Sequence, residues 1–531
     1  MNKTLVMTAG ALVALVNMAD ASSRKAAKPN VLIIITDDLG YSDPGCFGGD
    51  IPTPNIDRLA AEGMRMLRFH SNPVSSPTRA SLMTGLYPTR AGVGRMGLRT
   101  ALPEYGEHIR EDCTTIAENL KKNGYVTFTS GKWHLGSQHG ERPAQRGFDR
   151  SYSLLAGASD YYRPSSLHVD DLPVKPDAPN YYTTYYISDH AVKYIRESGD
   201  KPFFLYLSYN APHWPLQAPR EEVDQYIAFY MQGWDALRQA RFERQKTMGI
   251  VPPQTVLPPR DERVPAWDSL DEADKKSWAV KMSVYAAMVN IVDQGIGQII
   301  HLLEEQGVLD NTLIMFLSDN GACPWKSASY VKGTPAGADA QTPGSSIYYN
   351  FHWAQVSATP NHYYKRFTYE GGVNVPFIVR YPRGVKAGTF SSVDAHVIDI
   401  LPTCLDYTGS KLLTTFRGNK TQQNLDGVSL KATFAGSTKP LHDVIGWEHG
   451  GERGLLKGTW KMVWNNADKV DQWQLFDLTK NGGIEIEDVA HKYPEKLEEL
   501  IGEYDRWAAR NKVLTQEQIR KIPKLKGDGG E

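Results

Sequence analysis

Four apolar runs along the chain lack the alternation of apolar and polar residues that marks a half-exposed strand. They cover residues 31–36, 203–207, 312–317 and 375–381. Unbroken apolar runs of this length are typical of strands that are covered on both faces. We therefore predict a buried strand at each of these four places, and a further strand at residues 125–130.

Helical segments are predicted between the strands. One begins near Pro54, with Thr53 placed as its cap and Gly63 placed to end it. The others are expected at 115–123, 188–197, 276–306 and 398–406. Because strands and helices alternate, we predict an α/β fold with a large, mainly parallel sheet sandwiched by helices.

Two long segments interrupt this alternation. Residues 218–275 are charged, contain Trp and a Pro-rich stretch, and are predicted to form a helical insertion over the edge or rim of the sheet. Residues 323–362 are predicted to be a long functional loop. The main domain is expected to span 29–430. A smaller α+β subdomain is expected at 431–531, with a short antiparallel sheet and a helix at 493–511.

The start of the chain has the three-part plan of a cleavable secretory signal. Lys3 precedes an apolar run at 5–16, and small residues surround Asp20. Residues 1–21 are therefore predicted to be a signal peptide rather than a short buried helix. This prediction implies a secreted protein, located in the periplasm if the source is a bacterium.

Composition narrows the set of partners. The chain has 59 Lys and Arg against 60 Asp and Glu, a formal charge of -1. Such a balance gives no bulk attraction to nucleic acid or to anionic lipid. We expect no nucleic-acid partner and no membrane insertion. The four cysteines are widely spaced without a CxxC pair, so a zinc ribbon is unsupported, while one or two disulfides remain open.

Acidic pairs follow two of the predicted strands. Asp37 and Asp38 come directly after the first strand, and Asp319 and Asn320 come directly after the strand at 312–317. Open α/β sheets place their sites at the carboxyl ends of parallel strands. One such pair alone would be read as a helix cap. Two pairs placed alike, with four oxygen donors, predict a site for Ca²⁺, with Mg²⁺ as the alternative to it.

The segment that begins at Ser75 reads SSPTRASLMTG. From the residues alone it is a serine before a turn, an arginine and a short apolar helix with a glycine stop, and a capping serine would explain it. The segment also resembles the signature of the formylglycine-dependent type I sulfatases. In that signature Cys or Ser, any residue, Pro, Ser or Thr, and Arg precede a short helix that ends in Thr-Gly. Every defining position matches.

This resemblance implies an alkaline-phosphatase-like fold and a chemistry. Ser75 would be oxidised to formylglycine, and a serine at this position is similar to the bacterial branch that an anaerobic radical iron-sulfur enzyme matures. The hydrate of formylglycine would attack sulfate monoesters and later expel sulfate. The resemblance also implies that Ca²⁺ is ligated by Asp37, Asp38, residue 75, Asp319 and Asn320, and that Arg79 steadies formylglycine.

Three further fragments resemble the pocket of that family. Lys132 and His134 lie in GKWHLG, and the resemblance implies a sulfate clamp and a partner of the hydrate hydroxyls. His213 lies in APHWP after the strand at 203–207, where we expect it to protonate the leaving oxygen. Lys365, which precedes Glu-Gly-Gly, aligns with a second sulfate-binding lysine. The loop at 323–362 would then border the active site.

Resemblance to a subfamily of these enzymes indicates the class of substrate. The segment that surrounds Tyr364 and the insertion ending VPAWDSL resemble the bacterial arylsulfatases. Export and a serine at position 75 favour a sulfated carbohydrate, such as a galactose or amino sugar, with small aryl sulfates as the alternative. Aromatic and polar groups on loops suit sugar rings. Candidate sugar contacts are Asp160, Tyr161, Tyr162, Arg163, His352 and Trp353.

Two other classes of function compete with this interpretation. A phosphatase or phosphodiesterase on the same sheet is disfavoured, because such enzymes usually have Asp-His-Gly where this chain has Asp319-Asn320-Gly321. A catalytically silent binder of sulfated glycans would leave Ser75 unoxidised. Retention of every expected ligand and clamp argues against it.

Overall fold

The computed structural model describes residues 28–324 and 347–525, apart from the single residues 417, 422, 467, 469 and 471. The predicted signal peptide at 1–21 lies outside the described residues. Most of the predicted loop at 323–362 also lies outside them.

A mixed sheet of ten strands crosses the molecule in the order β11-β2-β10-β9-β1-β8-β4-β5-β6-β7. Its centre is parallel, because β1 pairs in parallel with both β8 and β9, and β4 with both β8 and β5. Strand β10 runs antiparallel to β9. The predicted mainly parallel sheet is therefore confirmed. The strands are β1 (Asn30–Thr36), β2 (Met64–Met66), β4 (Val126–Lys132), β5 (Arg150–Leu154), β6 (Leu167–Val169), β7 (Leu172–Pro173), β8 (Phe203–Ser208), β9 (Thr312–Ser318), β10 (Phe377–Arg380) and β11 (Thr389–Ser391).

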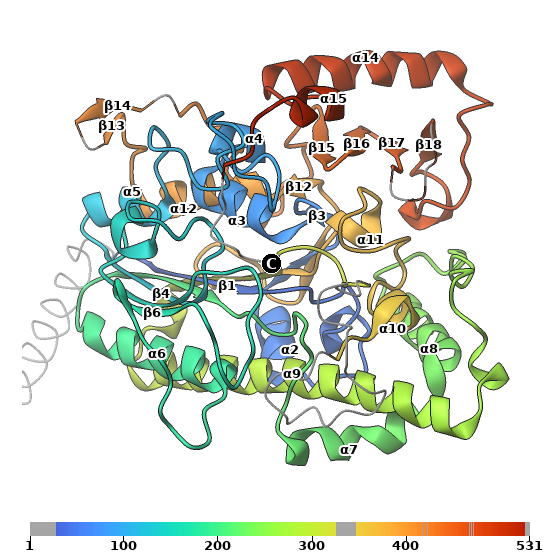
Figure 1. Ribbon diagram of the computed structural model, residues 1–531, viewed down its shortest axis with the longest axis horizontal. Coiled ribbons are helices and arrows are strands. Elements are labelled where there is room, and N and C mark those ends of the chain that lie inside the picture. The colour runs from blue at the N-terminus through green and yellow to red at the C-terminus, as the bar shows by residue number, and fades with distance from the viewer. Residues whose placement is uncertain are drawn as a thin grey trace, which may run out of the picture.

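Helices cover both faces of this sheet (Figure 1). Alternate residues of β1 enter two different core clusters: Val31, Ile33 and Ile35 join one, and Leu32 and Ile34 join the other. All five are fully buried, which explains why the run has no polar alternation. On one side lie α3 (Ser75–Thr84), α5 (Ile116–Lys122) and α12 (Ile400–Thr408), and on the other lie α2 (Pro54–Ala61), α6 (Thr183–Ser198) and α9 (Glu272–Glu305).

The cap of helix α2 differs from the prediction. Thr53 is the residue before the helix, but its hydroxyl accepts no bond from the first turn; it receives the amide of Gly45 at 2.8 Å instead. Asp293 of α9 accepts from the amides of Asn55 and Ile56 at 3.1 and 2.8 Å. A carboxylate supplied by another helix therefore does the capping, which no local pattern reveals.

The insertion contains α7 (Arg220–Tyr230) and α8 (Gly233–Thr247). Helix α7 packs on α9, outside the helical layer of the sheet, rather than over the sheet's edge (Figure 1). Helix α8 packs on α10 (Asn350–Ser357), which lies inside the segment predicted to be a loop. That prediction was wrong for these residues. Trp353 of α10 is fully buried against Trp234 and Trp267, so long-range aromatic packing stabilises a helix that has little amphipathic pattern of its own.

The C-terminal part forms the predicted antiparallel sheet and helix. Strands β15 (Ile445–His449), β16 (Glu452–Lys457), β17 (Trp460–Trp464) and β18 (Trp473–Asp477) pair in that order. Helix α14 (Pro494–Arg510) packs on β15 and β16 (Figure 1). The shorter elements are β3 (Phe69–His70), β12 (Ala395–His396), β13 (Thr415–Phe416), β14 (Asn419–Lys420), α4 (Pro88–Ala91), α11 (Glu370–Val373), α13 (Lys431–Phe434) and α15 (Gln516–Arg520).

Two expectations from composition can be compared with the fold. The four cysteines are buried, and no disulfide links them in the described part of the chain. Across residues 28–324 and 347–525, no helix is both long enough and apolar enough to pass through a bilayer.

Candidate active site

The two acidic pairs meet at the carboxyl ends of neighbouring strands. Strands β1 and β9 pair in parallel with Thr36 opposite Ser318, so the residues that follow each strand lie together. The amide of Asp319 donates to the carbonyl of Thr36 at 3.0 Å, and the amide of Asp38 donates to Asp319 Oδ1 at 3.3 Å. Asp37, Asp38, Asp319 and Asn320 are all almost completely buried. The predicted oxygen cluster is therefore brought together.

Ser75 is the first residue of α3, and every residue of this helix is buried. Its hydroxyl does not cap the helix, since Val74 precedes the helix and no side chain caps it. Instead Arg79, one turn later, donates from Nε to Ser75 Oγ at 2.9 Å. His134 Nδ1 lies 3.4 Å from the same oxygen. The serine is thus held among charged and polar groups rather than used in folding the helix.

Arg79 links Ser75 to the acidic cluster. Its Nη2 lies 2.9 Å from Asp319 Oδ2, and its Nη1 donates to Ser208 and, at 3.3 Å, to Tyr206. Burial acts to lower the pKa of Arg79, but Tyr206, Asp319 and Asp37 raise it above its ordinary value. The sequence interpretation missed Ser208 and Tyr206, because they lie within an apolar strand and carry no local signal.

Two lysines bind Asp37 and Asp38. Lys132 Nζ donates to Asp37 Oδ2 at 2.6 Å, and Lys365 Nζ donates to Asp38 Oδ1 at 2.7 Å. Burial lowers the pKa of Lys132. Burial also acts to lower the pKa of Lys365, but Asp38, Cys323 and Asp37 together raise it above its ordinary value. Burial acts to raise the pKa of Asp38, whereas Lys365 and His213 lower it below the usual range.

Three of the four residues of the cluster keep one side-chain oxygen that bonds to no described group, whereas both oxygens of Asp319 accept hydrogen bonds. Asp37 Oδ1, Asp38 Oδ2 and Asn320 Oδ1 are buried without a hydrogen-bond partner among the described residues. The amide nitrogen of Asn320 donates to Asp38 Oδ1 at 2.7 Å, which fixes the other oxygen of the amide. A buried acceptor without a partner costs about 1–3 kcal/mol. Oxygen atoms of this kind fit a hard cation such as Ca²⁺.

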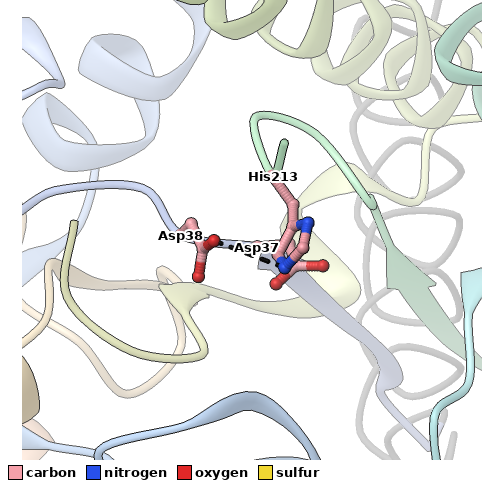
Figure 2. Close-up of side chains that lie close together, drawn as sticks. All are labelled: Asp37, Asp38 and His213. Atoms are coloured by element: carbon pink, nitrogen blue, oxygen red, sulfur yellow. Dashed lines mark ion pairs between the residues drawn. The ribbon is translucent and has the colours of Figure 1, made fainter. Parts of the chain in front are cut away.

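His213 lies in the loop after β8 and points its ring at this cluster (Figure 2). Its Nε2 is 3.5 Å from Asp38 Oδ2, and ligand atoms of Asp37, Asp38 and His213 fall within 4.8 Å of one another. Its Nδ1 lies 2.6 Å from the carbonyl of Trp214. Burial lowers the pKa of His213 to about 3, although Asp38 acts to raise it. Burial therefore favours the neutral form of the ring.

Tyr161 was predicted to contact sugar, and the structure contradicts this. Its side chain is fully buried, and its hydroxyl donates to the carbonyls of Asn210 and His213 at 2.8 and 2.9 Å. A side chain that no solvent reaches cannot contact a sugar ring in this conformation. Tyr161 instead positions the loop that carries His213.

The other predicted sugar contacts lie in two places. Asp160 Oδ1 accepts from the amides of Tyr162 and Arg163 at 2.9 and 2.8 Å, so Asp160 holds a turn together, with Arg163 exposed on it. His352 stacks on Trp278 with ring centroids 3.9 Å apart. Trp353 is fully buried and cannot contact sugar. For Asp160, Tyr162, Arg163 and His352 the role stays a prediction.

A small cavity beside Asp38 has aromatic walls that the sequence interpretation missed. Trp214, Tyr348 and Tyr349 line it together with Asp38. Trp214 is half-buried and follows His213 directly, so the fragment APHWP could have identified it. Tyr348 is brought there from a distant part of the chain.

Comparison with known proteins identifies the family. Residues 29–410 match the family model described as "Sulfatase". The chain belongs to the sulfatase family. Residues 360–503 of this sulfatase also match the model described as "N-sulphoglucosamine sulphohydrolase, C-terminal". It is therefore a sulfuric ester hydrolase with the predicted alkaline-phosphatase-like fold.

Individual relatives agree with this. The sulfatase is 34% identical to an uncharacterized sulfatase of Schizosaccharomyces pombe, over 94% of this chain and 96% of that protein. It is 34% identical to the arylsulfatase of Klebsiella aerogenes, over 76% of this chain and 92% of that protein. A crystal structure of Ps i-CgsB in complex with k-i-k-neocarrahexaose is similar to it with a TM-score of 0.66 and 28% identity, covering 91% of this chain and 93% of that one.

Proposed function

We propose that this sulfatase cleaves the S–O bond of sulfate monoesters with formylglycine made from Ser75, beside Ca²⁺ held by Asp37, Asp38, Asp319, Asn320 and residue 75. Two features of the site together support this proposal. Ser75 Oγ lies within reach of Arg79 and His134, and three buried oxygens of the same cluster have no hydrogen-bond partner among the described residues.

Conversion of Ser75 to an aldehyde removes two hydrogens, which requires the radical iron-sulfur maturation enzyme as oxidant. An aldehyde hydrate at position 75 would supply two hydroxyls on one carbon, one to attack sulfur and the other to expel sulfate afterwards. A bound Ca²⁺ would offset negative charge on residue 75 and on the sulfate group. The positive end of α3 adds to that effect, because residue 75 is its first residue.

Four side chains around residue 75 have distinct proposed roles. Arg79 holds the oxygen of residue 75 by the bond from its Nε. His134, 3.4 Å from that oxygen, accepts its proton. Lys132 and Lys365 hold the sulfate oxygens, since both ammonium groups are anchored beside it by Asp37 and Asp38.

His213 is proposed to protonate the leaving oxygen. Its Nδ1 proton is engaged by the carbonyl of Trp214, so the proton given to the leaving group must sit on Nε2 and the ring must be an imidazolium. The pKa of His213 is held low by burial and by two lysines. The negative sulfate ester bound beside the ring would raise this pKa, so that the acid forms together with the substrate complex.

The proposed substrate is a sulfated carbohydrate, such as a sulfated galactose or amino sugar. The structurally similar Ps i-CgsB was crystallised with k-i-k-neocarrahexaose at 28% identity, and the half-buried Trp214 beside the cluster offers an aromatic face for a sugar ring. Small aryl sulfates are the second candidate, favoured by the relative named arylsulfatase. Secretion to the periplasm, expected from residues 1–21, completes the proposal.

Two measurements test it. Peptide mass spectrometry of chain produced with the maturation enzyme should show that Ser75 has lost two hydrogens, and active protein with intact serine would overturn the mechanism. A panel of sulfated mono- and oligosaccharides is then compared with an aryl sulfate. Turnover of the aryl compound alone would support the second candidate. Binding of glycans without turnover, by protein whose Ser75 stays intact after production with the maturation enzyme, would point to a silent binder.

A further inference from the structure

A second polar pocket lies between the insertion and the segment that carries Lys365. It encloses about 580 Å³. Its lining consists of Arg238 of α8, Gln355 of α10, the stretches 259–263 and 361–364, and Asp468 and Val470. Helices α8 and α10 pack together beside this pocket, and they lie next to each other in Figure 1. No residue of the Ser75 cluster lines this pocket.

Arg238 of α8 is the unusual group in this pocket. Its side chain is 8% exposed, and it forms no ion pair within the described chain. Its Nη1 donates to the carbonyl of Pro258 at 2.9 Å, while its Nε has no hydrogen-bond partner among the described residues. A buried guanidinium that lacks a carboxylate is costly unless another anion neutralises it.

Two other nitrogens in the pocket are in the same condition. Asn361 Nδ2 and His362 Nδ1 are buried and have no partner among the described residues. Asn361 is 9% exposed. Burial lowers the pKa of His362 to about 4, and Arg238 acts in the same direction, so Arg238 and His362 lie within electrostatic reach of each other. A bound anion would act against both effects and raise the pKa of His362, and uptake of a proton by the ring would make Nδ1 a third donor.

The other charged side chains of the lining are paired, apart from the exposed Glu262. Arg260 pairs with Asp235 at 2.9 Å. Asp261 accepts from Arg263 at 2.6 Å and from the hydroxyl of Tyr364 at 2.8 Å. Glu262, which also lines the pocket, is exposed to solvent. Asp468, the remaining carboxylate of the lining, lies 3.4 Å from Arg263. Burial lowers the pKa of Arg238, and Tyr364, Asp235 and Asp261 act against it from a distance. No ion pair to Arg238 forms among the described residues, so it is the buried cation of this lining that lacks one.

We propose that this pocket binds an oxyanion through Arg238, Asn361 and His362. The occupant is a sulfate or carboxylate group, borne by the substrate away from the cleaved ester or present as free inorganic sulfate. The substrate arm rests on the proposed glycan specificity. Tyr364, which lines the pocket, directly precedes Lys365, whose ammonium binds Asp38. An anion bound here would therefore sit behind the segment that carries a sulfate-binding lysine.

Inorganic sulfate is the probe for the free anion. Calorimetric titration of the full chain should show two sulfate sites, the Ser75 cluster and this pocket. Arg238→Gln should lose one site or weaken it about tenfold, as expected for a charge-assisted hydrogen bond. Arg260→Gln is the matched control, because Arg260 lines the same pocket but already has Asp235 as partner, and it should keep both sites. This titration needs no turnover, so it shows whether the pocket binds sulfate even if Ser75 is never oxidised.

Kinetics distinguish the two sources. For oxidised protein, the ratio of kcat/KM on a disulfated oligosaccharide to that on a monosulfated one should fall about tenfold in Arg238→Gln if the substrate supplies the anion. A lost sulfate site without a change in this ratio identifies free sulfate as occupant. Asn361→Asp places a carboxylate in the pocket and should weaken sulfate binding and change the kcat/KM ratio in the same way. This second variant keeps the test possible if Arg238→Gln does not fold. If neither variant changes sulfate binding or the ratio, the proposal is wrong.

Discussion

Lys132 and Asp37 come from strands that are separated by β8, and the Lys132 ammonium lies 2.6 Å from Asp37 Oδ2. Both side chains are almost completely buried. This contact leaves the other oxygen of Asp37 without a partner in the described chain. One carboxylate thus has one oxygen committed to the lysine and one directed elsewhere, and Lys365 and Asp38 repeat the arrangement.

Replacement of this lysine should damage turnover rather than folding alone. Lys132→Ala should lower kcat/KM for any sulfate ester about 10²- to 10³-fold, the usual effect of removing one preorganised charge donor. Steady-state kinetics on protein with matched formylglycine content give the value. Lys121→Ala is the control, because Lys121 is 47% exposed and pairs with Asp149 on the surface. A Lys132→Ala enzyme that keeps its wild-type kcat/KM would remove the lysine from the mechanism.

Calcium should stabilise the folded protein through the same cluster. At a concentration 100 times its dissociation constant, a ligand that binds only the native state contributes about 2.7 kcal/mol. We therefore expect the Tm to rise by several degrees when calcium is added to chelator-treated protein. Asp38→Asn should lose most of this rise, whereas Asp310→Asn, at a side chain 73% exposed, should keep it. Restoration of Tm and activity by zinc alone would contradict an oxygen-only site.

The residues that could be predicted are those at ends of elements. Asp37 and Asp319 were identifiable because each directly follows an apolar run, and parallel strands end at the same edge. Ser208 and Tyr206 belong to the same cluster, but they are part of the apolar strand β8, and no local pattern distinguishes them from residues of the core. Contacts between distant segments are not encoded in any local pattern, so these two residues required the structure.

The wrong predictions have the same origin. Tyr161 lies on a turn and suited a sugar contact, yet its hydroxyl is used on two carbonyls of the His213 loop. Residues 350–357 have little helical periodicity, and aromatic packing against α8 makes them a helix. Burial decided both cases, and burial depends on which segments meet. The lack of an ion pair to Arg238 among the described residues is likewise a property of the fold alone.

The Tyr161 hydroxyl offers a test of positioning at a distance from the substrate. Tyr161→Phe removes the donor for two buried carbonyls, which should cost about 1–3 kcal/mol of unfolding free energy. Because the His213 loop loses its anchor, kcat should fall more than KM rises, and the basic side chains of the cluster should be unaffected. Tyr493→Phe, at a side chain 46% exposed, is the control. Equal stability and kcat in both variants would show that the loop is held by other contacts.

Asp293 should make stability depend on pH in the opposite sense from a salt-bridged carboxylate. Burial raises its pKa from 3.8 to about 6, although the amides of Ile56 and Asn55 that it caps act to lower it. Because the folded state holds this proton more tightly than the unfolded state, the contribution is present in full below about pH 4 and is lost as pH rises through 6. Each pKa unit corresponds to about 1.4 kcal/mol. Asp293→Asn keeps one oxygen for the cap but cannot ionise.

The stabilities of Asp293→Asn and of the wild type should therefore differ by different amounts at two pH values. The free energy of unfolding of Asp293→Asn minus that of wild type should be larger at pH 7.5 than at pH 4.5, by an amount on the order of 1–3 kcal/mol. The variant should thus be the relatively more stable protein at the higher pH. Denaturant titration at both pH values measures it. Asp271→Asn is the matched control, since Asp271 caps α9 from an exposed position, and its relative stability should change less between the two conditions. A difference that is the same at both pH values would mean that the Asp293 carboxyl ionises in the folded protein as readily as in the unfolded chain, and that its capping bonds to α2 fully offset its burial.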